Sequence, residues 1–142
     1  MFDALSEVTG EISNQPGKKV VVVFTDGDDN SSVLTAQAAV GRATKNGVPV
    51  FSIAEGEASA SSRLKKILMD LSRSTGGETF EISDMKDIDE IFLKISTVLP
   101  HMYLITYQPP VEPDDGKWRQ IEISIADEKG YRIRAKQGYF PK

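Results

Sequence analysis

The chain of 142 residues contains no cysteine, which excludes disulfide bonds and metal sites built on thiolates. No apolar run approaches the roughly 20 residues that a membrane-spanning helix needs, so we expect no membrane span. The first residues show no basic and apolar signal-peptide pattern, and the compartment stays open. A net charge of -4 argues against nucleic acid as the main partner. His101 is the only histidine, so no second imidazole can share a metal with it.

What the sequence does contain is an apolar run that leads into a cluster of carboxylates, KVVVVFTDGDDN at residues 19–30. A continuous apolar run predicts a parallel strand that is buried on both faces. Ligands of open α/β sheets bind beyond the carboxyl ends of the strands, where Asp26 follows this strand. Asp26 is therefore the candidate ligand of a hard cation. The rim of the site is predicted to comprise Thr25, Gly27, Asp28, Asp29, Asn30 and, after the next strand, Glu55.

Helices and strands alternate along the first hundred residues, which indicates a parallel sheet with right-handed crossovers. Ser31 and Ser32 can cap a helix that ends before Gly47, and Ser61 or Ser62 opens the next helix. The apolar face of the first helix is predicted to comprise Phe2, Leu5, Val8 and Ile12. Strands are predicted at 20–25, 48–53 and 78–82, and the last helix at 84–99.

The pattern changes in the last third of the chain. Residues 101–108 are predicted to form a strand, and the two segments after it a β-hairpin. Placing Ile125 opposite Tyr131 gives one apolar face, and the same register sets Glu122 opposite Arg134. Both faces agree on this register.

The carboxylate cluster admits more than one interpretation. An EF-hand loop that starts at Asp26 would need glycine and glutamate where the chain has Ser31 and Gln37, which excludes that calcium site. A strand followed by Asp-x-Asp also resembles haloacid-dehalogenase-type phosphotransferases. There, Asp26 and Asp28 would act as nucleophile and acid/base around magnesium. Asn30 departs from the threonine or valine that such a site expects.

A third interpretation covers nearly the whole chain. The apolar strand followed by Thr-Asp-Gly, the later strands and the tail occur in the order of a von Willebrand factor type A domain. The segments beyond Pro100 resemble the tail of its bacterial VWFA-related branch. The segments that carry the resemblance are 20–30, 48–53, 76–80, 103–107, 116–121 and 132–139. The resemblance implies a partial doubly wound (Rossmann-like) parallel α/β sheet over 1–99, the C-terminal half of such a domain, and an antiparallel β extension over 100–142.

The resemblance also implies a function. Domains of this family bind a divalent metal, usually Mg²⁺, through three loops, and an acidic residue of a protein partner completes the coordination. Only the Asp-Gly loop is present here, so Asp26 is expected to hold Mg²⁺, Mn²⁺ or Ca²⁺ weakly in an incomplete site. The implied function is non-enzymatic protein binding, with a metal-free structural interaction module as a further alternative. The family branch is often exported.

One strand of the expected sheet should lack a neighbour. In the family, the strand that matches Val20 to Phe24 lies beside the metal-bearing first strand, which this chain does not contain. An apolar edge strand with unpaired N–H and C=O groups is a template for another chain. We therefore predict self-association into a homo-oligomer, or pairing with a missing N-terminal half. The residues of this predicted edge are Val20, Val21, Val22, Val23 and Phe24.

Overall fold

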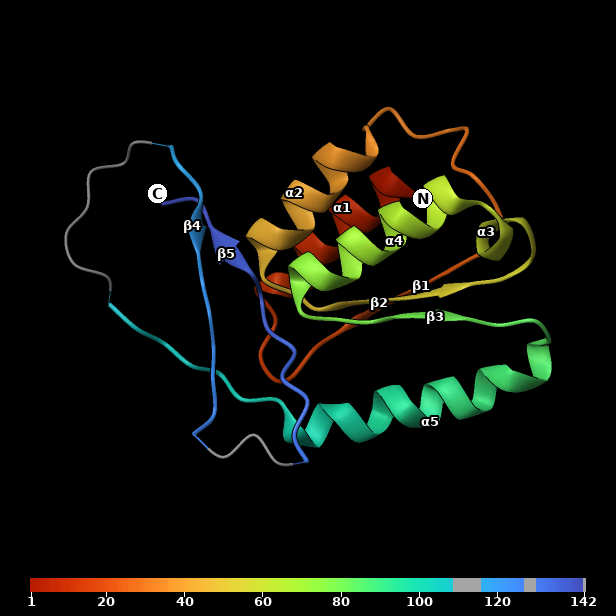
Figure 1. Ribbon diagram of the computed structural model, residues 1–142. Coiled ribbons are helices and arrows are strands. Elements are labelled where there is room, and N and C mark those ends of the chain that lie inside the picture. Colours follow the sequence, from red (N-terminus) through yellow and green to blue (C-terminus); the bar gives the residue numbers. More distant parts are fainter. Residues whose placement is uncertain (109–115, 127–129, 142) are drawn as a thin grey trace.

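A three-stranded parallel sheet forms the centre of the computed structural model, which describes residues 1–108, 116–126 and 130–141 (Figure 1). Its strands lie in the order β1 (Val21–Thr25), β2 (Val50–Ala54) and β3 (Thr79–Glu81). The helices are α1 (Phe2–Ser13), α2 (Ala36–Asn46), α3 (Gly56–Ala60), α4 (Ser62–Thr75) and α5 (Ile88–Val98), with 3-10 turns η1 (Met85–Asp87) and η2 (Leu99–His101). A second, antiparallel sheet pairs β4 (Arg119–Gln120) with β5 (Gly138–Tyr139). The predicted fold class is confirmed.

Helices cover both faces of the parallel sheet. The helices α1, α2 and α4 lie on one face and α5 lies on the other (Figure 1). The core under the three helices contains Val50 of β2 with Leu5 and Leu71. On the α5 side, Phe51 and Ile53 pack with residues of α5 and with the half-buried Val22 of β1. Successive residues of a strand point to opposite faces, so β2 contributes to both cores.

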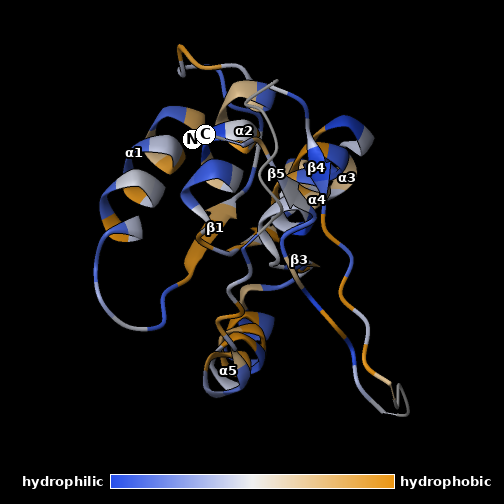
Figure 2. Cartoon of the chain, turned by 90° about the vertical axis from the view of Figure 1, so that its left-hand side faces the viewer, coloured by the Kyte–Doolittle hydropathy of each residue, from blue (hydrophilic) through white to orange (hydrophobic). Residues whose placement is uncertain are grey.

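The strand buried on both faces is β2 rather than β1, which corrects the prediction from the apolar run. Every residue of β2 is buried, whereas Val21 to Val23 are half-buried and Phe24 is 43% exposed. The reason is position, because β1 lies at one edge of the described sheet and β2 at its centre. Figure 2 shows the hydrophobic β1 at the side of the sheet.

Most helix ends follow the predicted capping residues, with one correction. Ser61 caps α4, and both Gly47 and Gly76 adopt the left-handed conformation just beyond their helices. The start of α2 was wrongly placed at Ser31 or Ser32, since Thr35 is the N-cap and accepts a hydrogen bond from the Ala38 N–H at 3.2 Å. The two serines are engaged elsewhere, as described below.

The buried face of α1 is rotated slightly from the predicted one. Thr9 is fully buried and Val8 is 41% exposed. Thr9 can occupy the core because its hydroxyl donates to the Leu5 carbonyl at 2.8 Å and accepts from Asn46 Nδ2 at 3.0 Å. A buried hydroxyl with both partners links α1 to the end of α2.

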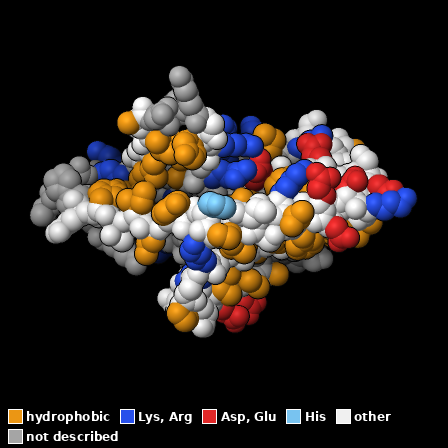
Figure 3. All heavy atoms as spheres, turned by 90° about the horizontal axis from the view of Figure 1, so that it is seen from below, with side chains coloured by type: hydrophobic (Ala, Val, Ile, Leu, Met, Phe, Trp, Pro, Cys, Tyr) orange, Lys and Arg blue, Asp and Glu red, His pale blue; other side chains and the backbone are white. Residues whose placement is uncertain are grey.

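The C-terminal tail (residues 102–108, 116–126 and 130–141) contains less strand than predicted. Residues 102–108 are not a strand, because no described strand lies beside them to pair with. Tyr103, Leu104, Ile105 and Tyr107 are between 57% and 92% exposed. Figure 3 shows apolar side chains on the surface on both sides of the pale blue His101.

The predicted hairpin register is wrong by two residues. Arg119 pairs with Tyr139 and Gln120 with Gly138, and the Ile121 N–H donates to the Gln137 carbonyl at 2.8 Å. The predicted ion pair is also wrong, since Arg134 binds Glu78 beside the parallel sheet instead of its cross-strand neighbour. A shift of two residues keeps each side chain on its face, so the apolar pattern alone could not detect it.

Candidate functional site

The loops that follow β1 and β2 form the carboxyl edge of the sheet, the place predicted for a ligand. Asp26 is exposed, and its carboxylate has no hydrogen-bond or ion-pair partner in the described part of the chain. Its backbone carbonyl accepts a hydrogen bond from the Ala58 N–H of α3 at 3.1 Å. Thr25 shapes the turn, since its hydroxyl donates to the Gly27 carbonyl at 2.9 Å. The structure therefore holds the Asp26 backbone and leaves its carboxylate free.

The other predicted rim residues differ in their contacts and in their exposure. Asp28 lies 3.6 Å from Arg63 Nη1 at the start of α4. Asn30 is exposed, and Glu55 is half-buried with its N–H bound to the Thr25 carbonyl at 3.0 Å. Asp28 thus has a cation as its neighbour.

Asp29 has a structural role that the sequence did not predict. Its side chain is 2% exposed and accepts hydrogen bonds from the backbone N–H of Phe2 at 2.7 Å and of Ser31 and Ser32 at 3.0 Å. The Ser32 hydroxyl also donates to it. Burial alone would raise the pKa of Asp29, but the hydrogen bonds from the Ser32 hydroxyl and the Phe2 N–H outweigh it and hold the pKa far below its ordinary value.

A second carboxylate joins the same two segments in the opposite direction, and together with Asp29 it clamps the start of α1 to the loop after β1. Asp3, in the first turn of α1, accepts hydrogen bonds from the N–H groups of Val33 at 2.8 Å and Leu34 at 2.9 Å. These two bonds lower the pKa of Asp3. Sequence reasoning missed the clamp because its partners are about thirty residues apart and no local pattern joins them.

The described residues gather no cluster of acidic side chains at the carboxyl edge. Across residues 1–108, 116–126 and 130–141, no three His, Cys, Asp or Glu side chains come together as metal ligands. Magnesium requires six oxygens in near-octahedral geometry. Asp26 offers one free carboxylate, while Asp29 is occupied by the clamp and Asp28 faces Arg63. Asp26 is therefore the carboxylate of this loop that is left without a partner among the described residues.

Comparison with known families agrees with this architecture. The sequence model of the von Willebrand factor type A domain matches residues 1–94. The chain belongs to the von Willebrand factor type A domain family. The match to this family ends within α5 and does not reach β4 and β5. No curated protein matches the sequence. In the described part of this von Willebrand A chain, no helix has the length and apolar character to cross a membrane.

Proposed function

We propose that this chain is a non-catalytic protein-interaction module that contacts its partner at the carboxyl edge, around Asp26. Domains of its family are interaction modules in general, and the free carboxylate of Asp26 is the observation that supports this location. A carboxylate that is exposed, without a partner and held by a fixed backbone is available to a ligand. The hydrogen bonds at Thr25 and Ala58 support a preformed edge rather than a loop that orders on binding.

Divalent metal is proposed to bind here only weakly. One carboxylate leaves the other coordination positions to water, and Mg²⁺ gives up water reluctantly. An acidic residue of the partner would supply further oxygen ligands, in line with the resemblance to the family. The tail and any self-association through β1 would add contacts that need no metal.

Calorimetry with Mg²⁺ and Mn²⁺ tests the proposal. We expect a dissociation constant in the millimolar range or weaker, and its loss in Asp26→Asn. Asp28→Asn is the matched control, because it removes a neighbouring charge from the same loop. Micromolar binding that depends on Asp26 would contradict an incomplete site. Metal binding that is unchanged in Asp26→Asn would place the metal elsewhere, and no metal binding at all would favour the metal-free structural module.

A further inference from the structure

Two arginines of the tail share one carboxylate beside the parallel sheet. Arg132 Nη1 lies 2.7 Å from Glu78 Oε1, and Arg134 Nη2 donates to Glu78 Oε2. Glu78 directly precedes β3, so this cluster lies at the amino end of the sheet, opposite to the carboxyl edge. Because one carboxylate serves two guanidinium groups, the cluster keeps a net positive charge.

The two arginines differ in what they can still bind. The side chain of Arg132 is 72% exposed, so most of its five donors remain open to a ligand. The side chain of Arg134 is 26% exposed, and its Nε is buried without an acceptor among the described residues. An unsatisfied buried N–H is unfavourable. The cluster is short of acceptor oxygens.

A cavity of about 470 Å³ opens beside the cluster. Phe80 and Val98 supply apolar walls, and Lys94 adds a third cation. Lys94 Nζ pairs with Glu90 at 2.7 Å, but both side chains are largely exposed, and such surface pairs are weak enough to rearrange. A cavity of this size and lining fits a small organic group that carries a negative charge.

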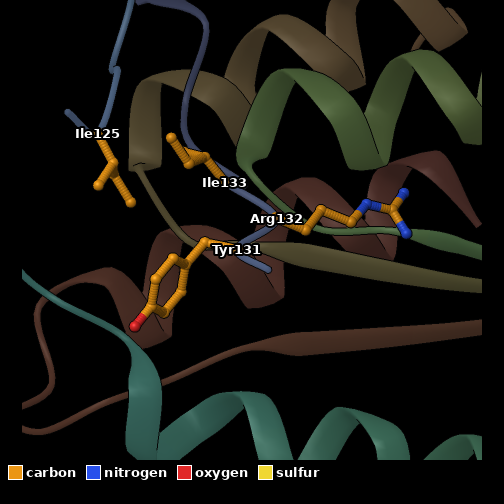
Figure 4. A pocket seen from close by; sticks show the side chains of 4 residues that line it. All are labelled: Ile125, Tyr131, Arg132 and Ile133. Atoms are coloured by element: carbon orange, nitrogen blue, oxygen red, sulfur yellow. The ribbon is translucent and has the colours of Figure 1, made fainter. Parts of the chain in front are cut away.

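Arg132 also borders a second, smaller cavity. Its volume is about 320 Å³, and its other lining residues are Ile125, Tyr131 and Ile133. Figure 4 shows that the Arg132 guanidinium points away from Tyr131, as expected for neighbours in an extended segment. This smaller cavity therefore lies at the backbone end of Arg132, away from its guanidinium.

We propose that Arg132 binds the carboxylate of an acidic side chain from a protein partner, with apolar neighbours of that residue in the adjoining cavities. The ligand carboxylate replaces Glu78 on Arg132. Glu78, no longer held by Arg132, can then turn so that Oε1 accepts the hydrogen bond that Arg134 Nε lacks. The exchange satisfies the buried N–H while keeping each guanidinium paired with a carboxylate, the geometry that arginine prefers. This site lies at the amino end of the sheet and does not rest on Asp26 or on a metal.

The test is a titration of the full chain followed by NMR, with a chelator present so that no metal contributes. The probe is a blocked leucine-glutamate-leucine tripeptide, and its glutamine counterpart keeps the shape without the charge. We expect the glutamate peptide to shift the amide signals of Thr97 and Val98 and the Nε–H signal of Arg134 in a saturable way. The glutamine peptide and free acetate should bind about tenfold more weakly or worse.

Variants assign the effect to Arg132. Arg132→Gln should weaken the glutamate peptide about tenfold, while Arg132→Lys should give an intermediate loss because it keeps the charge without the fork. Arg63→Gln is the control, an exposed arginine at the carboxyl edge. The backbone spectrum of each variant shows whether the fold is retained.

Three results would overturn the proposal. They are equal binding of the two peptides, unchanged binding in Arg132→Gln, and an Arg134 Nε–H signal that stays fixed at saturation. If acetate bound as tightly as the glutamate peptide, the ligand would be a small carboxylate, which would contradict the proposal of a protein partner.

Discussion

The carboxylate of Asp29 accepts a hydrogen bond from the backbone N–H of Phe2 at 2.7 Å, across 27 residues of chain. Asp3 makes the reverse connection from the first turn of α1 to the N–H groups of Val33 and Leu34. The helix and the loop therefore cap each other, which satisfies N–H groups that a helix start leaves open. Since Asp26 lies in the same loop, this clamp determines where the carboxyl edge sits.

Asp29→Ala is expected to lower the free energy of unfolding by about 2–3 kcal/mol, because several N–H groups lose a charged acceptor in a buried place. Asp28→Ala is the control in the same loop. Its ion pair with Arg63 is exposed, so a change within about 0.5 kcal/mol is expected. Urea unfolding followed by circular dichroism measures both. Equal losses would show that the clamp contributes nothing specific.

Acid should weaken the fold through the same carboxylate. The pKa of Asp29 in the folded chain lies well below the ordinary value of about 3.9, so the unfolded chain takes up the proton first as pH falls. The contribution of Asp29 to the free energy of unfolding is present above about pH 4 and is lost progressively as the pH falls below that value. Asp3 acts in the same direction. Asp29→Asn should therefore show a flatter decline in the free energy of unfolding below pH 4, and an unchanged decline would contradict this assignment.

Two glycines should respond to alanine in opposite directions. A Cβ on Gly77 would lie 1.9 Å from the Val50 carbonyl oxygen, so Gly77→Ala must displace β2 or the loop before β3. A loss of about 2 kcal/mol or more is expected. Gly41 lies inside α2 with open space around it, and Gly41→Ala should stabilise by about 0.5–1 kcal/mol. Thermal unfolding of both variants and of the parent chain measures these changes. A stabilising effect of Gly77→Ala would contradict the close approach of Gly77 to the Val50 carbonyl.

Self-association through β1 stays a prediction, and the structure indicates which atoms would take part. The Val21 N–H binds Pro49 and the Thr25 carbonyl binds Glu55, so alternate residues face β2. Val22 and Phe24 therefore direct their N–H and C=O groups outward, where no described strand pairs with them.

Phe24→Lys should shift the chain towards monomer in light scattering, because it places a charge on an exposed edge residue with little loss of burial. Phe92→Lys on α5 is the control, with a side chain of similar exposure. A parent chain that stays monomeric at high concentration, with slow amide exchange at Val22 and Phe24, would contradict the prediction.

No phosphatase turnover is expected. The alternative phosphotransferase mechanism needs Asp26 and Asp28 to act together around magnesium, and Asn30 stands where such a site expects threonine or valine. Hydrolysis of p-nitrophenyl phosphate with Mg²⁺ should stay at the level of buffer. Turnover that disappears in both Asp26→Asn and Asp28→Asn would restore that alternative.

Local signals in the sequence determined the three parallel strands and the order of the helices between them, whereas the strand predicted at 101–108 was wrong. Ser61, Gly47 and Gly76 act within one helical turn, so capping chemistry alone locates those helix ends. The alternation of helices and strands was enough to predict a parallel sheet. The position of Asp26 after an apolar strand was enough to predict a carboxylate at the carboxyl end of that strand.

Tertiary structure decided which strand became central and which carboxylates stayed free. Burial of β1 depends on its neighbours rather than on its own residues, and a hairpin shifted by two residues shows the same apolar pattern. Asp29, Asp3 and Glu78 have partners that are 27, 30 and 56 residues away in the chain. Such contacts depend on how separate elements pack, so no spacing in the sequence could distinguish the free Asp26 from the clamped Asp29.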